Sequence, residues 1–114
     1  MNTMFFPSGS RQFIDHPKFE GVKLAKLVAE GKSDMVSVSE LIIDPGVTVP
    51  VHTHDPQIDS IYVVSGRGEA FINGEWTGAA AGDYIFVPAL VEHGVRNISN
   101  EPLRLFIHHS PPFL

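Results

Sequence analysis

Hydrophobic and polar positions alternate along most of the chain, in short segments that end at glycine, proline or asparagine. Side chains of a strand point to opposite faces in turn, so each segment predicts a half-buried β-strand. From residue 35 onward, the segments are 35–43, 47–54, 58–64, 67–72, 84–87, 92–97 and 103–109. The Asn73-Gly74 pair after the fourth segment is a strong signal for a β-hairpin.

Residues 22–29 are ambiguous, because their apolar positions also suit one face of a helix. Their short length and the flanking Gly21 and Gly31 favour a strand. We therefore expect about eight or nine short strands and no convincing helix, which is typical of an all-β sandwich, jelly roll or small barrel.

Composition narrows the class further. The chain has 114 residues, which allows one domain, and its lack of cysteine excludes a disulfide scaffold, an iron–sulfur cluster and a thiolate zinc site. The formal charge of -5 argues against nucleic acid or an anionic membrane as the main partner. We find no signal peptide and no apolar run of membrane-spanning length, so we expect a cytoplasmic protein.

We divide the chain into an N-terminal arm or edge strand, 1–20, and a single β domain, 21–114. The Phe5-Phe6 pair in the arm either packs against another subunit or belongs to a disordered tail, and the pattern leaves both readings open. The apolar residues 111–114 are a second candidate for a subunit interface, because an exposed apolar patch is costly.

The histidines supply the candidate chemistry. His52 and His54 share one face of a predicted strand, because side chains alternate with period two. Asp59 follows after a turn and His93 lies on a later strand, so three imidazoles and a carboxylate can meet. This donor set suits one divalent metal ion per chain, Fe, Mn, Ni, Co or Zn. Gln57 is an alternative oxygen ligand from the same turn.

The spacing of these residues resembles the two sequence motifs of the cupin superfamily. The first motif is matched by Gly46, His52, His54 and Gly66, with Asp59 where the family usually has Glu. The second is matched by Gly82, Pro88, His93 and Asn97, with Leu90 where the family usually has Gly. The two motifs cover residues 46–97, nearly half of the chain.

This resemblance implies a small single-domain cupin of the conserved-barrel type: a double-stranded β-helix, or jelly roll, of two antiparallel sheets, usually a homodimer. The implied metal ligands are His52, His54, His93 and Asp59. Asp59 is one methylene shorter than Glu, so it binds the ion directly, binds it through a water, or leaves a site of three histidines. Leu90 replaces a glycine of a tight turn, so we expect a differently shaped loop at 88–92.

The last predicted strand has two different faces, Arg104, Phe106 and His108 on one, and Leu105, Ile107 and His109 on the other. If the first face points inward, Arg104 and His108 lie beside the metal and, with Tyr62, are candidates for general acid–base catalysis. If it points outward, Arg104 pairs with Glu101 or another carboxylate. We assign no role to the two remaining histidines, His16 and His109.

These features predict a small metal-binding cupin that acts on a small, oxygen-rich organic substrate. The metalloenzyme hypothesis has two branches, a dioxygenase and a non-redox isomerase or lyase of the sugar-acid type. The alternative is a cupin that binds a small molecule, for example as a sensor, without converting it. A direct transcription factor is not expected, because the chain has no basic stretch and no room for a DNA-binding helix pair.

Overall fold

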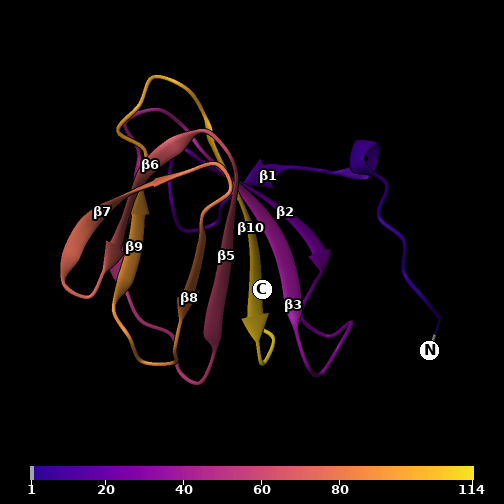
Figure 1. Ribbon diagram of the computed structural model, residues 1–114. Helices are drawn as coiled ribbons and strands as arrows, with labels where there is room; N and C mark the ends of the chain where they lie inside the picture. The colour runs from indigo at the N-terminus through magenta and orange to yellow at the C-terminus, as the bar shows by residue number, and fades with distance from the viewer. Residues whose placement is uncertain (1) are drawn as a thin grey trace.

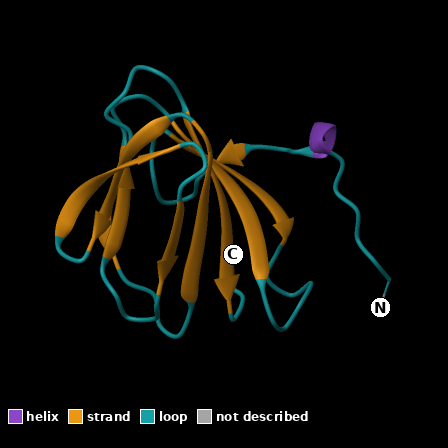
Figure 2. Cartoon of the chain, viewed as in Figure 1, coloured by secondary structure: helices purple, strands orange, loops and turns teal. Residues whose placement is uncertain are grey.

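The computed structural model describes residues 2–114, so the first residue of the expected arm, 1–20, lies outside the described residues. Two antiparallel sheets face each other (Figures 1 and 2). The six-stranded sheet contains, in spatial order, β1 (Ile14–Asp15), β2 (Val22–Val28), β3 (Ser37–Ile43), β10 (Leu103–Ser110), β5 (Ile58–Ser65) and β8 (Tyr84–Val87). The four-stranded sheet contains β4 (Thr48–His52), β9 (His93–Arg96), β6 (Arg67–Ile72) and β7 (Glu75–Ala80).

These strands confirm the predicted all-β class of two antiparallel sheets. The ambiguous segment forms β2, and the Asn73-Gly74 turn joins β6 to β7 with positive φ at both positions, 50° and 86°. Between residues 2 and 114 the helical structure is one short 3-10 turn, η1 (Ser8–Ser10). No helix in that range has the length and apolarity needed to cross a membrane.

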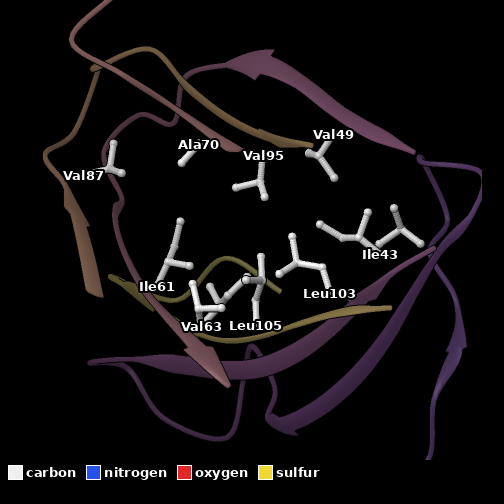
Figure 3. Close-up of a cluster of buried hydrophobic side chains, with 11 residues drawn as sticks. Ile43, Val49, Ile61, Val63, Ala70, Val87, Val95, Leu103 and Leu105 are labelled. Carbon is white, nitrogen blue, oxygen red and sulfur yellow. The ribbon is translucent and has the colours of Figure 1, made fainter. Parts of the chain in front are cut away.

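The core lies between the sheets and is apolar through most of its depth. Figure 3 shows Ile61 and Leu105 of the six-stranded sheet pointing toward Ala70 and Val95 of the four-stranded sheet. Burying one such aliphatic side chain stabilises the fold by about 1.5–3 kcal/mol, so the aliphatic face of each strand is held inward.

Strand register places a polar row at one end of this core. Ser37 on β3, His109 on β10 and Asp59 on β5 are aligned across the six-stranded sheet. On the facing sheet, His52 on β4 is the partner of His93 on β9. The two sets meet between the sheets, since Asp59 Oδ2 lies 3.1 Å from His93 Nε2.

The carboxylate of Glu40 holds the part of the N-terminal arm that precedes β1 against the outer face of the six-stranded sheet. Glu40 on β3 accepts hydrogen bonds from Arg11 Nε at 2.8 Å and from Arg104 Nε at 2.7 Å. Burial alone would raise the pKa of Glu40, but the hydrogen bonds from the two guanidinium groups outweigh it and lower that pKa. Beyond this anchor the arm extends away from the barrel (Figure 1), and Phe5 is exposed.

Replacing Glu40 with glutamine tests this anchor. We expect Glu40→Gln to lower the free energy of unfolding at pH 7 by about 1–3 kcal/mol, because two charge-assisted hydrogen bonds lose their anion. The folded-state pKa of Glu40 lies below its unfolded value. Its contribution is therefore present above about pH 4.5 and is lost as the pH falls through the folded-state pKa. Urea unfolding at neutral and acid pH measures the difference.

Glu69→Gln is the matched control, because Glu69 forms a more exposed pair with Arg96 and its loss is expected to cost at most about 1 kcal/mol. Equal losses in the two variants, or a Glu40→Gln deficit that stays constant down to about pH 2, would show that the arm is not held in this way.

Candidate metal centre

Strands β4 and β9 bring three histidine rings to one point. His52 and His93 are register partners, and His54 follows the end of β4 by two residues. One ring nitrogen of each histidine lies within 4.8 Å of the other two. The structure therefore brings together the three imidazoles that the sequence motifs select.

Backbone carbonyls orient two of these rings. His52 Nδ1 donates to the carbonyl of Pro50 at 2.6 Å, and His93 Nδ1 donates to the carbonyl of Val91 at 2.9 Å. In His93 the Nε2 atom faces Asp59 Oδ2 and can bind an ion only after losing any proton that it donates to that oxygen, whereas in a neutral His52 a proton on Nδ1 leaves Nε2 with a free lone pair. This is the arrangement that metal-ligating histidines commonly use.

Asp59 lies against the same cluster from the opposite sheet. Its Oδ2 is 3.1 Å from His93 Nε2, 3.5 Å from His109 Nε2 and 3.6 Å from His54 Nε2. Its other oxygen, Oδ1, is buried and has no hydrogen-bond partner among residues 2–114. A buried acceptor without a partner is rare in folded proteins, so Oδ1 has lone pairs to offer to a bound group.

The fourth ring of the cluster is His109, to which the sequence analysis assigns no role. His54, Asp59 and His109 form a second set of ligand atoms within 4.8 Å of one another, and this set shares His54 with the first. The signal for His109 is its parity with Leu103, Leu105 and Ile107, which places it on the aliphatic face of the strand.

The charges in the cluster follow from these contacts. Burial would raise the pKa of Asp59, but the imidazoles of His109, His54 and His93 around its Oδ2 outweigh burial and hold that pKa far below its usual range. Burial would lower the pKa of His93, but the hydrogen bonds to Asp59 and Val91 raise it. Burial lowers the pKa of His52, which favours its neutral form. Asp59 is therefore an ionised carboxylate.

This donor set fits a divalent cation. It combines imidazole nitrogens with one ionised carboxylate, whose Oδ1 has no partner among the described residues, and it contains no thiolate; such a set suits the borderline first-row metals. The residues that would hold the ion are His52, His54 and His93 with an oxygen of Asp59, and His109 lies beside them against the other carboxylate oxygen.

The cluster opens into a cavity of about 210 Å³ between the sheets. The wall beyond the cluster is largely aliphatic and includes Leu41, Ile61, Val95, Leu105 and Ile107. The loop between β1 and β2 adds His16, Lys18 and Phe19 to the lining. The pocket therefore has one polar end and an apolar body.

The C-terminal residues 111–114 pack on their own chain beside this pocket. The Phe113 ring lies 4.6 Å from the His54 ring between centroids, and the Phe113 backbone N–H donates to Ser37 Oγ at 2.9 Å. Gln57 Nε2 donates to the Pro112 carbonyl at 3.2 Å. Gln57 thus holds this tail and is absent from the residues that line the pocket.

Of the two orientations left open for the last strand, the structure has the outward one, so the placement of Arg104 and His108 as catalytic candidates in the pocket is wrong. Along β10 the buried positions are Leu103, Leu105, Ile107 and His109, and the intervening residues face outward. The reason is apolar area, since three aliphatic side chains favour burial over an arginine. Tyr62 is also on an outward-facing position, with 45% of its surface exposed. None of the three residues lines the pocket, so we do not retain them as catalytic candidates.

His16 is the second histidine that the sequence analysis sets aside. Its Nδ1 accepts hydrogen bonds from the backbone N–H groups of Lys18 at 3.1 Å and Phe19 at 3.3 Å. Its ring lies 4.8 Å from that of Phe19, which in turn lies 6.3 Å from His52. His16 therefore shapes the loop that forms one side of the pocket.

The loop between β8 and β9 connects the two halves of the cluster. The Leu90 N–H donates to the His54 carbonyl at 2.8 Å, and the neighbouring Val91 carbonyl orients His93. Leu90 has a φ of 68°, in the left-handed region that favours glycine. The expected change of loop shape is thus not required, because the leucine itself adopts a backbone conformation that glycine takes freely.

Comparison with known proteins agrees with this geometry. The family model described as Cupin domain matches residues 39–109, more than half of the chain. The protein therefore belongs to the cupin family, and the predicted membership is confirmed.

Two relatives show the range of similar sequences. An uncharacterized protein of Methanocaldococcus jannaschii is 30% identical over 77 residues, 68% of this chain and 62% of that protein. The polyketide synthase CurC of Streptomyces cyaneus is 33% identical over 70 residues, 61% of this chain and 46% of that protein. The matched chain thus spans less than two thirds of the length of either relative.

Solved structures resemble the whole chain at lower identity. The polyketide cyclase RemF of Streptomyces resistomycificus superposes with a TM-score of 0.82 at 20% identity, covering 99% of this chain and 87% of that one. A predicted oxalate decarboxylase of Thermotoga maritima superposes with a TM-score of 0.85 at 22% identity, covering 95% and 99%. At these identities the similarity establishes the fold alone, the cupin double-stranded β-helix.

Replacing Leu90 with glycine removes the backbone strain at this position, and we expect this change to stabilise the loop that connects His54 and His93. A left-handed φ costs a residue with a Cβ about 1–2 kcal/mol, whereas glycine loses about 0.5–1 kcal/mol of additional chain entropy on folding. The Leu90 side chain is 64% exposed, so little burial is lost. Leu90→Gly should therefore raise the free energy of unfolding by about 0.5–1 kcal/mol in thermal or urea melts.

Leu90→Ala is the control, because alanine keeps the Cβ and therefore the strain while losing the same side chain. We expect it to be no more stable than the wild type. A Leu90→Gly protein that melts below Leu90→Ala would contradict the assignment of strain to this residue.

Proposed function

We propose that the protein is a metal-dependent cupin that binds a small molecule with an apolar body and two adjacent oxygen donors, such as a catechol or a 1,3-dicarbonyl compound. The observation that carries the proposal is the position of the imidazole and carboxylate cluster at one end of an otherwise apolar pocket. We further propose that the molecule is converted without net oxidation.

The ion, one Fe, Mn, Ni, Co or Zn per chain, would supply Lewis acidity to a coordinated oxygen. The residues around it have separate tasks. The Pro50 and Val91 carbonyls keep the His52 and His93 rings oriented. Asp59 brings the negative charge that balances a cation at this end of the pocket.

We assign proton transfer in the pocket to the cluster, because Arg104, His108 and Tyr62 face outward and His16 Nδ1 already accepts two backbone hydrogen bonds. Asp59 Oδ2 and His109 Nε2 are 3.5 Å apart and can hold a proton between them at the polar end. The aliphatic wall excludes water from the body of the substrate.

The wall also selects between substrate classes. A sugar acid carries a hydroxyl on most carbons, and each one placed against an aliphatic side chain without a partner costs about 1–3 kcal/mol. An aromatic or enolised body with its oxygens at one end avoids this cost. The names of CurC, a polyketide synthase, and RemF, a polyketide cyclase, are consistent with such a compound.

Metal binding is tested with untagged protein, stripped by a chelator and then loaded with each metal in turn. We expect a metal at about 100 times its Kd to stabilise the wild type by about 2.7 kcal/mol and to raise Tm by several degrees. His93→Ala should lose this rise. His108→Ala, whose ring lies on the outer face of the same barrel, should keep it. A rise of equal size in all three proteins, or less than about 0.1 ion per chain after loading, would refute the metal site.

Substrate class is tested by NMR titration of zinc-loaded protein with 4-methylcatechol, acetylacetone and glucuronate. The first two should bind at least about tenfold more tightly than glucuronate, because they place no hydroxyl against the wall. Tighter binding of glucuronate than of the other two compounds would instead favour the hypothesis of a sugar-acid substrate. Oxygen uptake by the Fe(II)-loaded protein would instead support a dioxygenase, and binding with no product would support the non-catalytic alternative.

We also propose a homodimer formed through the outer face of β5 and β8. Tyr62, Val64, Tyr84 and Phe86 are exposed there, and exposed aromatic side chains gathered on one sheet face are typical of an interface. Phe86→Glu should lower the molar mass measured by light scattering from that of a dimer to that of a monomer. Glu75→Lys, on the other sheet, should leave the molar mass unchanged. A wild type that is monomeric at about 100 μM would end this proposal.

A further inference from the structure

Beyond the cluster, the aliphatic part of the pocket wall contains the buried hydroxyl of Ser39. Ser39, on β3, is 2% exposed, and its hydroxyl has no hydrogen-bond partner among the described residues. It lines the cavity on the same strand face as Leu41. A buried hydroxyl in an apolar wall costs stability unless it forms a hydrogen bond, so this one is free to bind a ligand atom.

Ser37 provides a contrast two residues earlier on the same face of β3. Its hydroxyl is equally buried, but it accepts hydrogen bonds from the backbone N–H groups of Phe113 at 2.9 Å and Leu114 at 3.4 Å. The hydroxyl of Ser37 therefore has a structural role, because it holds the C-terminal tail. The hydroxyl of Ser39 has no such contact among the described residues.

The register fixes where Ser39 lies relative to the cluster. Ser37 is aligned with His109 and Asp59, while Ser39 is aligned with Ile107 and Ile61, the next inward-facing row. Two residues along an antiparallel strand span about 7 Å. Ser39 therefore faces the apolar part of the pocket, about 7 Å along the sheet from the row that contains Asp59.

We propose that Ser39 determines specificity by donating a hydrogen bond to a further oxygen of the substrate, one that lies on its body away from the two oxygens at the cluster. The proposal rests on the proposed function, since it assumes that the substrate's paired oxygens lie at the metal end. It narrows the substrate class to compounds with three oxygens in this arrangement, such as a catechol with a carbonyl across the ring.

The protein without ligand or metal gives the first test. Ser39→Ala removes a hydroxyl that has no hydrogen-bond partner in the described part of the chain, so Tm should stay the same or rise. Ser37→Ala, the matched control, removes the acceptor that holds the tail, so Tm should fall. A fall of similar size in Ser39→Ala would mean that its hydroxyl is structurally bonded, and the proposal would be wrong.

The second test compares two ligands of similar size on zinc-loaded protein, 3,4-dihydroxybenzaldehyde and 4-ethylcatechol. Zinc is not redox-active, so binding is measured without oxidation by the metal. We expect Ser39→Ala to weaken binding of the aldehyde by about tenfold and to leave binding of 4-ethylcatechol unchanged. Comparing wild type with variant for each ligand cancels the difference in acidity between the two catechols.

The outcomes separate the two proposals. If both catechols bind and Ser39→Ala does not change the affinity for the aldehyde, the proposed specificity role of Ser39 fails and the proposed function stands. If neither catechol binds any zinc-loaded protein while metal binding is retained, the proposed substrate class fails, and the role of Ser39 toward it fails as well.

Discussion

The buried carboxylate of Asp59 is the constraint on which the site depends. An ionised carboxylate between two sheets is costly unless donors or positive charge surround it. Here ring nitrogens of His54, His93 and His109 lie within 3.6 Å of one oxygen, and the second oxygen has no partner among the described residues. These rings come from three separate segments, so one charge requires both sheets to be in register. A cation at this point would satisfy the remaining oxygen.

The rest of the pocket follows from keeping that charge at one end. The aliphatic faces of β3, β5 and β10 continue inward from the polar row, so the cavity changes from ionic to apolar within a few residues. The same alternation sends Arg104 to the outer face, where it pairs with Glu40 and shares that carboxylate with the arm. The inner face of the six-stranded sheet thus contributes Asp59 and His109 to the cluster, while its outer face holds the N-terminal arm through Glu40.

Much of this could be predicted from the sequence, because its signals are local. Strand β6 has the bounds that alternation predicts, and the Asn73-Gly74 turn follows it, because strand and turn chemistry depend on adjacent residues. The three motif histidines also follow, because their spacing is characteristic of a family. The orientation of β10 does not follow, because alternation defines two faces without saying which is buried. His109 was missed for this reason.

The sequence by itself determined the class of fold, the positions of most strands and the histidines 52, 54 and 93. Only the tertiary structure decided that His109 joins them, that His108 does not, and that Ser39 has no hydrogen-bond partner between residues 2 and 114. The physical reason is that burial and hydrogen bonding are shared properties of several strands. Whether a side chain faces the core depends on what its neighbours across the sheet contribute, and those neighbours are distant along the chain.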